Sequence, residues 1–156
     1  MADIVSPKTR SRMMAGIKSG NTKPEIVIRS GLHKKGFRFR LHDRKLPGKP
    51  DLVFPRHGAV IFVNGCFWHG HDCHLFKWPK TREDFWKNKI SSNKARDITN
   101  IATIKNAGWR VAVVWECALK GKARLELDSV IDLCSFWLRN GANELEVRGN
   151  ESGASI

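Results

Sequence analysis

Residues 65–74 read GCFWHGHDCH, and this stretch decides how the rest of the chain is organised. It holds two cysteines, three histidines and one acid, with an aromatic pair between two glycines. Cys66, His71 and Cys73 offer two thiolates and an imidazole, and Cys117 follows an apolar run further along the chain. Together they predict a closed, structural Cys3His site, for which Zn2+ is the usual metal. Four unrelated core thiols are the alternative, because the spacing is irregular.

The 156-residue chain is strongly basic, with 28 Lys and Arg against 15 Asp and Glu and a formal net charge of +13. Residues 1–50 carry thirteen of these cations and three acids, whereas the last thirty residues lean acidic. A basic half on a folded domain that contains aromatic residues indicates a polyanionic partner, most simply nucleic acid. The alternative is a surface whose charge only keeps the protein soluble.

The length supports one domain, and 41% apolar residues are enough to fill its core. No window approaches eighteen apolar residues, and the N-terminus lacks the charged and apolar regions of a secretory signal. We therefore expect a cytoplasmic protein, in which the four cysteines suit metal binding better than disulfides. The domain is expected over residues 1–139, with a basic arm and short helix within 1–20 and a loose tail over 140–156.

Helix and strand patterns follow one another along the chain. Helices are predicted over residues 22–36, 81–107 and 125–138, and strands over residues 37–41, 51–54, 59–63 and 109–115. The middle two strands form a hairpin, and the long helix before a further strand indicates a crossover, so we predict an α/β domain with a mixed central sheet flanked by helices. A capping box is predicted at the start of the long helix. Its buried stripe is predicted to comprise Phe85, Ile98, Ile101, Ala102 and Ile104.

Two acids stand where either structure or chemistry can use them. Glu25 lies three residues after Thr22, the spacing of a capping box, and this structural role is its first interpretation. Asp51 opens a short apolar strand directly after a turn that contains two prolines. A carboxylate on a rigid strand can ligate a metal, and the alternative is a solvated residue at the strand end.

The motifs, taken in their order along the chain, resemble those of the very short patch repair (Vsr) endonucleases. The matches span residues 6–138 and are T-x-x-E ending at Glu25, LPGKPD at 46–51, VIF at 60–62, GCFWHGHDC at 65–73, FW at 85–86, GWRV at 108–111 and VWECAL at 114–119. The resemblance is specific because the zinc set and the metal-site acid occur together in the right order. It implies a fold like that of the type II restriction endonucleases and a Mg2+-dependent nick 5′ to the thymine of T:G mismatches, which arise when 5-methylcytosine deaminates.

The resemblance also implies roles for single residues in catalysis. Asp51 would ligate Mg2+ through its carboxylate and Val63 through its backbone carbonyl, in a site for two ions that stabilise the attacking hydroxide and the leaving oxygen. His69 would act as the general base or its relay, while Glu25 would order metal-bound water.

The implied DNA contacts include an aromatic wedge beside the mismatch, one residue in the minor groove and two positions on the long helix. They are Phe67, Trp68 and Trp86 in the wedge, Met14 in the minor groove, and Lys89 and Asn93 on the helix. Unstacking a base step costs about a few kcal/mol, so a wedge favours steps that are already mispaired.

Val63 and Asn64 stand where the family pattern has Thr-His. The missing threonine side chain is tolerable because the backbone oxygen is the implied ligand. Asn64 can donate a hydrogen bond but cannot transfer a proton near pH 7, so we place His69 above Asn64 as the acid/base residue.

Two alternatives to this function stay open. One is a zinc-stabilised nucleic-acid binding module without catalysis, and the other is an endonuclease of the same fold with a different specificity. Zinc-dependent base deamination is excluded because neither H-x-E nor P-C-x-x-C occurs. We expect a monomer that acts on mismatched duplex DNA at the bacterial nucleoid, with mismatch-repair proteins and a DNA polymerase as partners.

Overall fold

The computed structural model describes residues 21–150. The predicted basic arm and Met14 lie outside the described residues. The helices are α2 (Lys23–Lys34), α3 (Glu83–Asn106) and α4 (Leu127–Asn140), and the strands are β1 (Arg40–Leu41), β2 (Leu52–Phe54), β3 (Ala59–Asn64), β4 (Arg110–Trp115) and β5 (Glu144–Val147). Short 3-10 turns follow β2 at Pro55–His57 and β4 at Glu116–Ala118. No described helix has the length and apolar character that crossing a membrane requires.

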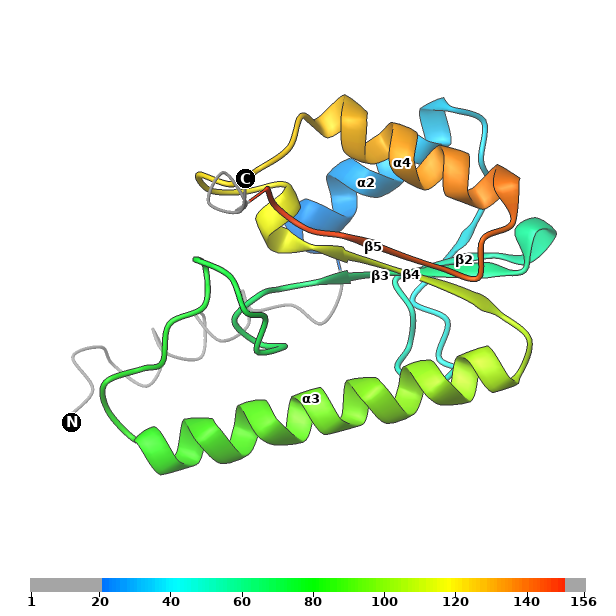
Figure 1. Cartoon of the computed structure of the whole chain (residues 1–156). Coiled ribbons are helices and arrows are strands. Elements are labelled where there is room, and N and C mark those ends of the chain that lie inside the picture. Colours follow the sequence, from blue (N-terminus) through cyan, green and yellow to red (C-terminus); the bar gives the residue numbers. More distant parts are fainter. Residues whose placement is uncertain (1–20, 151–156) are drawn as a thin grey trace, which may run out of the picture.

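The five strands form one mixed sheet in the order β1-β2-β3-β4-β5. β1, β2 and β3 pair antiparallel, whereas β3, β4 and β5 pair parallel. In Figure 1, α2 and α4 cover one face of the sheet and α3 runs along the other. The predicted α/β domain, its hairpin and its helical crossover are therefore confirmed.

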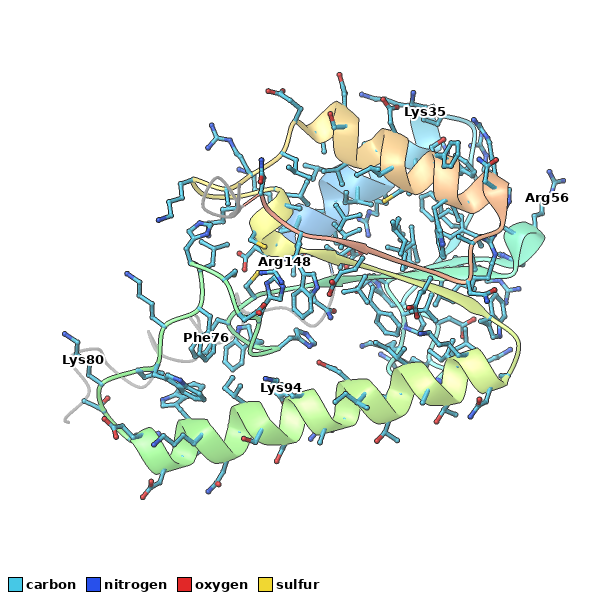
Figure 2. The ribbon with its side chains drawn as sticks, viewed as in Figure 1. Lys35, Arg56, Phe76, Lys80, Lys94 and Arg148 are labelled. Carbon is cyan, nitrogen blue, oxygen red and sulfur yellow. The ribbon has the colours of Figure 1, made fainter. Side chains whose placement is uncertain are left out.

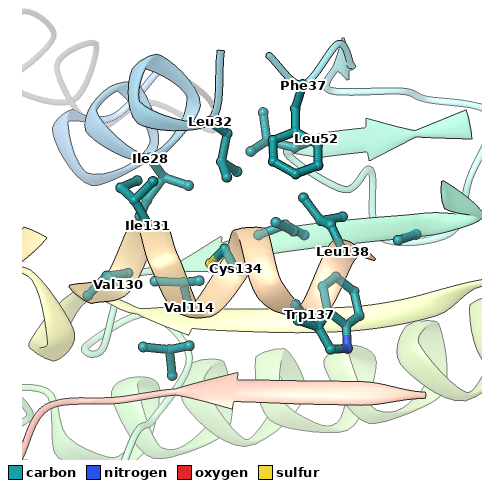
Figure 3. Close-up of a cluster of buried hydrophobic side chains, with 14 of the residues drawn as sticks. Ile28, Leu32, Phe37, Leu52, Val114, Val130, Ile131, Cys134, Trp137 and Leu138 are labelled. Atoms are coloured by element: carbon teal, nitrogen blue, oxygen red, sulfur yellow. The ribbon is translucent and has the colours of Figure 1, made fainter. Parts of the chain in front are cut away.

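β3 from Ala59 to Val63 and β4 from Val111 to Trp115 are unbroken apolar runs, because both faces of the sheet are covered at these strands. On β3, Ala59 and Ile61 belong to the cluster under α2 and α4, while Val60 and Phe62 belong to the cluster that includes Ile104 of α3. Side chains alternate across a strand, so a sheet covered on both sides needs an unbroken apolar run. Figure 3 shows the larger cluster, in which Cys134 is a buried core residue.

The predicted loose tail is wrong for residues 144–147. This segment is β5, which pairs in parallel with β4 and buries Val147. The open edge of β4 presents N–H and C=O groups that need partners, and a short polar strand at a sheet edge carries no strong apolar signal. The strand predicted over 37–41 is likewise reduced to β1, which consists of Arg40 and Leu41.

The start and buried stripe of α3 differ from the prediction, although the helix has nearly the predicted bounds. No capping box forms, because the N-cap is Arg82 with a φ of 55° and no side-chain cap. Ile98 is 70% exposed and Phe85 is 44% exposed, whereas Ile90 and Ile104 are buried. The N-terminal part of α3 extends beyond the sheet (Figure 1), which leaves Phe85 partly exposed, whereas Ile98 and Ala102 are exposed because Asp97, Asn100 and Ile101 occupy the inward face of the helix. Along much of its length, the inward face of α3 meets a cleft instead of a core.

Candidate active site and metal cluster

A cleft of about 730 Å3 opens where the carboxyl end of β3 faces α3. It is lined by the start of α2, the turn before β2, the end of β3 with the following loop, and the inward face of α3. The predicted site residues in its lining are Asp51, Val63, Asn64, Phe67, Trp68, His69, Lys89 and Asn93. Ligand sites of open α/β sheets form at the carboxyl ends of strands, so the position itself is typical of an active site.

Asp51 is held at this edge by strand pairing. Because β2 runs antiparallel to β3, the acid that precedes β2 lies beside the end of β3, where its Oδ2 accepts a hydrogen bond from the Val63 N–H at 2.7 Å. Burial raises the pKa of Asp51 from 3.8 to about 7, the Val63 hydrogen bond opposes this rise, and the neighbouring Glu25 adds to it. A divalent cation at this position would favour the ionised carboxylate.

Glu25 is both a helix-capping residue and a part of the candidate site. Its N–H donates to Thr22 Oγ1 at 3.4 Å, and its own Oε1 accepts from the Asn21 N–H at 2.9 Å, one residue before the position that a capping box uses. The side chain is only 1% exposed. Its Oε2 lies 2.8 Å from Arg29 Nη1 and 2.7 Å from His42 Nε2. The structural and functional interpretations of Glu25 are thus compatible.

His42 is a member of the site that the sequence did not reveal. Ligand atoms of Glu25, His42 and Asp51 all lie within 4.8 Å of one another, so this group can hold a metal ion. His42 also donates its backbone N–H to the Asp51 carbonyl at 3.1 Å, and its φ of 49° is unusual for a residue other than glycine. It lies in a short polar loop without periodicity, where no sequence signal distinguishes it.

His69 faces the cleft from the loop after β3 and pairs with Asp97 of α3. The His69 Nδ1 and Asp97 Oδ2 atoms are 2.5 Å apart. A carboxylate at Nδ1 orients the imidazole and leaves Nε2 for proton transfer. Asp97 was also missed, although it lies four and eight residues after Asn93 and Lys89, which places all three on one face of the helix.

Asn64 and Asn93 line the cleft with different surroundings. Asn64 is buried as the last residue of β3, on the same side of the sheet as Phe62. Asn93 donates from Nδ2 to the Trp68 carbonyl at 2.8 Å. It therefore ties the loop to α3, a structural role beside the predicted contact with DNA.

The three predicted wedge residues form one aromatic group. The ring centroids of Phe67 and Trp68 are 5.2 Å apart, those of Phe67 and Trp86 are 5.3 Å apart, and those of Trp68 and Trp86 are 5.8 Å apart. Phe67 and Trp68 line the cleft, and Trp86 joins them from the first turns of α3. Each ring is partly exposed, as a surface that meets a base requires.

Cys66, His71, Cys73 and Cys117 form a second group, whose ligand atoms lie within 4.8 Å of one another. His71 Nδ1 is 3.5 Å from Cys66 Sγ and 3.6 Å from Cys117 Sγ. Tetrahedral bonds of ~2.3 Å to sulfur and ~2.0 Å to nitrogen place those atoms about 3.5 Å apart, so the donors fit a tetrahedral metal. Burial raises the pKa of the Cys66 and Cys117 thiols, and a bound cation would favour the thiolates.

The metal cluster is linked to the cleft through Trp115. The His71 and Trp115 rings stack with centroids 3.9 Å apart and 7° between their planes, and Trp115 also meets the His69 ring edge-on at 6.2 Å. Trp115 is held in turn by a 2.9 Å hydrogen bond from its Nε1 to Glu146 Oε2 on β5. The segment predicted as a tail therefore supports the loop that carries His69.

Comparison with known proteins identifies the family. A family model described as DNA mismatch endonuclease Vsr matches residues 2–75. The chain is 49% identical to the type II nicking enzyme V.XorIIP of Xanthomonas oryzae pv. oryzae over 134 aligned residues. The alignment covers 85% of this chain and 98% of that protein. It is 43% identical to the DNA mismatch endonuclease Vsr of Escherichia coli over 138 aligned residues, and this alignment covers 88% of each chain. Because these similarities extend over most of both chains and include the cleft and the Cys/His cluster, the protein belongs to the Vsr family of DNA mismatch endonucleases.

Proposed function

We propose that this protein nicks double-stranded DNA 5′ to the thymine of a T:G mismatch, with Mg2+ as the catalytic metal, and so starts the repair of deaminated 5-methylcytosine. Membership of the family makes it a hydrolase of DNA phosphodiester bonds with a fold like that of the type II restriction endonucleases. The relatives are described as nicking enzymes and as a mismatch endonuclease. The T:G mismatch, the metal and the roles of single residues are what the proposal adds.

The observation that carries the proposal is the meeting of Asp51 and His69 in one cleft from different elements. Asp51 and the Val63 carbonyl would hold Mg2+, with Glu25 and His42 beside them. Bound there, Mg2+ would stabilise the negative charge that develops on the phosphate and its attacking and leaving oxygens.

His69 is the chain's own acid/base group in this proposal. Its Nε2 accepts a proton from the attacking water, while Asp97 at Nδ1 keeps the ring oriented and stabilises the imidazolium that results. Asn64, buried at the end of β3, donates a hydrogen bond to the phosphate and transfers no proton.

We assign mismatch preference to the aromatic group, and general affinity for DNA to lysines that line the cleft. Insertion of Phe67, Trp68 and Trp86 requires unstacking, which costs less at a mispaired step than in a matched duplex. Lys49 and Lys89 line the same cleft and would contact phosphates, a sequence-independent attraction that falls with salt.

The Cys/His cluster is assigned a structural Zn2+. All four donors are protein groups, which leaves no coordination position for water or substrate. The cluster joins the loop after β3 to the turn after β4, and so shapes the segment that presents Phe67, Trp68 and His69. Zinc would therefore act on catalysis only through this loop.

The test is nicking of a duplex with one T:G mismatch in random flanking sequence, followed by sequencing of the cut ends. The wild type is expected to cut one strand 5′ to the thymine with Mg2+ and to leave the T:A duplex intact. Asp51→Ala and His69→Ala are expected to abolish cutting while binding to the mismatched duplex survives. Tight binding by the wild type without cleavage in any context would favour the binding module, and cutting elsewhere would favour a different specificity.

A further inference from the structure

Trp78 is a large aromatic residue that remains 50% exposed beside the aromatic group. It lies in the loop between the metal cluster and α3, outside the lining of the cleft. Its ring meets Phe76 edge-on with centroids 4.9 Å apart, and Phe76 stacks on Phe67 at 5.7 Å with 23° between the planes. Trp78 is thus the outer end of a row of rings that begins at the wedge.

The loop around Trp78 is basic as well as aromatic. Residues 75–82 read LFKWPKTR, which includes three cations and no acid. Lys77, Lys80 and Arg82 are exposed, and Arg82 lies over the Phe85 ring at 4.2 Å. Figure 2 shows Phe76 on the side of this loop that faces the N-terminal part of α3, and Lys80 at its outer edge. The acids that follow, Glu83 and Asp84, belong to the first turn of α3.

An exposed ring flanked by cations has the chemistry of a site for single-stranded nucleic acid. Bases stack on aromatic side chains irrespective of sequence, and neighbouring cations attract the phosphates that accompany them. The charge of the loop is complementary to DNA, and the row of rings is continuous with the wedge. Both features favour a nucleobase over an apolar protein surface as the occupant.

We propose that Trp78 stacks on an unstacked nucleobase of the substrate, as a second stacking surface outside the wedge. The two ring contacts place Trp78 within about 11 Å of Phe67, which at 3.4 Å per nucleotide corresponds to about three nucleotides. Trp78 therefore acts on a base within about three nucleotides of the mismatch and contributes to preference for the flanking sequence. This inference rests on the proposed function, because it assumes DNA opened at a mismatch.

Binding of Trp78 variants to a T:G duplex tests whether this residue stacks on a nucleobase. All variants carry Asp51→Asn, which is expected to prevent cleavage because it removes the proposed metal ligand. Trp78→Ala is expected to weaken binding about 5- to 150-fold, the range of one base stacked on an aromatic ring. Trp78→Phe and Trp78→Leu both keep an apolar contact with Phe76, but only Trp78→Phe keeps a ring face. We expect Trp78→Phe to retain most of the affinity and Trp78→Leu to lose it, so a similar result for these two variants would overturn the proposal.

Matched controls separate stacking from charge and from misfolding. Phe136→Ala removes a ring that is 68% exposed on α4, on the opposite face of the sheet, and is expected to leave binding unchanged. Lys80→Ala is expected to reduce the slope of log Kd against log salt by about one, whereas Trp78→Leu leaves that slope unaltered. Equal melting temperatures and metal contents establish that each variant is folded. If Trp78→Leu lowers the salt slope as Lys80→Ala does, its effect is electrostatic and the stacking assignment is wrong.

A 2-aminopurine scan locates the base. The fluorescent base is placed in turn at each position within four nucleotides of the mismatch on either strand. One position is expected to respond to the Asp51→Asn protein but not to the same protein with Trp78→Leu, while the signal at the mismatch stays the same. A scan that Trp78→Leu leaves unchanged throughout would overturn the inference. Failure of the proposed function would instead show in the Asp51→Asn protein itself, as equal affinity for T:G and T:A duplexes.

Discussion

Replacement of Asp51 by Asn is expected to stabilise the metal-free protein at neutral and alkaline pH. Burial raises the pKa of Asp51 from 3.8 to about 7, so the folded protein holds this proton more tightly than the unfolded chain. The carboxyl's contribution to stability is therefore fully present below pH 3.8 and is lost as the pH rises through about 7. Asn carries no charge, and its side-chain oxygen can still accept the Val63 N–H that Asp51 Oδ2 accepts now.

The pKa change bounds the size of this effect. A rise from 3.8 to about 7 corresponds to about 4 kcal/mol when the carboxylate is fully ionised. Water that enters the open cleft relaxes part of the penalty, so we expect the stability difference between Asp51→Asn and wild type to widen by about 1–3 kcal/mol between about pH 5 and about pH 8. For a chain of this size, that is a widening of about 3–9 °C in the difference between melting temperatures.

Thermal unfolding across this pH range measures the difference. Mg2+ should be removed by buffer exchange without a chelator, because a chelator would also extract metal from the cysteines. Added Mg2+ is expected to raise the melting temperature of the wild type, more at pH 8 than at pH 6, and to leave Asp51→Asn unchanged. The control is Asp132→Asn, because the Asp132 carboxylate is 66% exposed beside Lys35. The difference in melting temperature between this variant and the wild type should therefore vary little with pH.

The reasoning would be refuted by a gap between wild type and Asp51→Asn that does not vary with pH. Equal stabilisation of both proteins by Mg2+ would also contradict it, because the ion would then bind without the Asp51 carboxylate. If the difference in melting temperature varies with pH but neither protein responds to Mg2+, the raised pKa of Asp51 is supported and its assignment as a Mg2+ ligand is wrong.

Three further predictions follow from the same contacts. Cys117→Ser should lower metal content and melting temperature together, and a stable variant with one zinc ion per chain would contradict the Cys3His assignment. Trp68→Ala should weaken binding to the T:G duplex more than binding to the matched duplex, whereas the control Phe136→Ala should alter neither; equal losses on the two duplexes would exclude a wedge role. Asp97→Ala should slow single-turnover nicking about 10- to 100-fold, with little added to the loss caused by His69→Ala. Fully additive losses would show that Asp97 and His69 act independently.

The wrong predictions concern α3 and β5, whose environment depends on the segments packed beside them and not on their own sequence patterns. A helical stripe was expected to be buried because most helices pack against a core, but the inward face of α3 meets a cleft along much of its length. Asp97 and Asn100 therefore face inward, while Ile98 between them is exposed. The polar segment that forms β5 is a strand only because β4 offers it an open edge.

The sequence by itself determined the α/β order, the hairpin, the long crossover helix and the donor types of the Cys/His group. These features depend on short-range sequence patterns, namely apolar periodicity, turn residues and the dense Cys/His motif at residues 65–74. Only the tertiary structure decided which distant residues join them. His42 meets Glu25 across 17 positions and Asp97 meets His69 across 28, because helix and sheet packing bring these segments together. Such pairings depend on the register of strands and the rotation of helices, which local patterns do not encode.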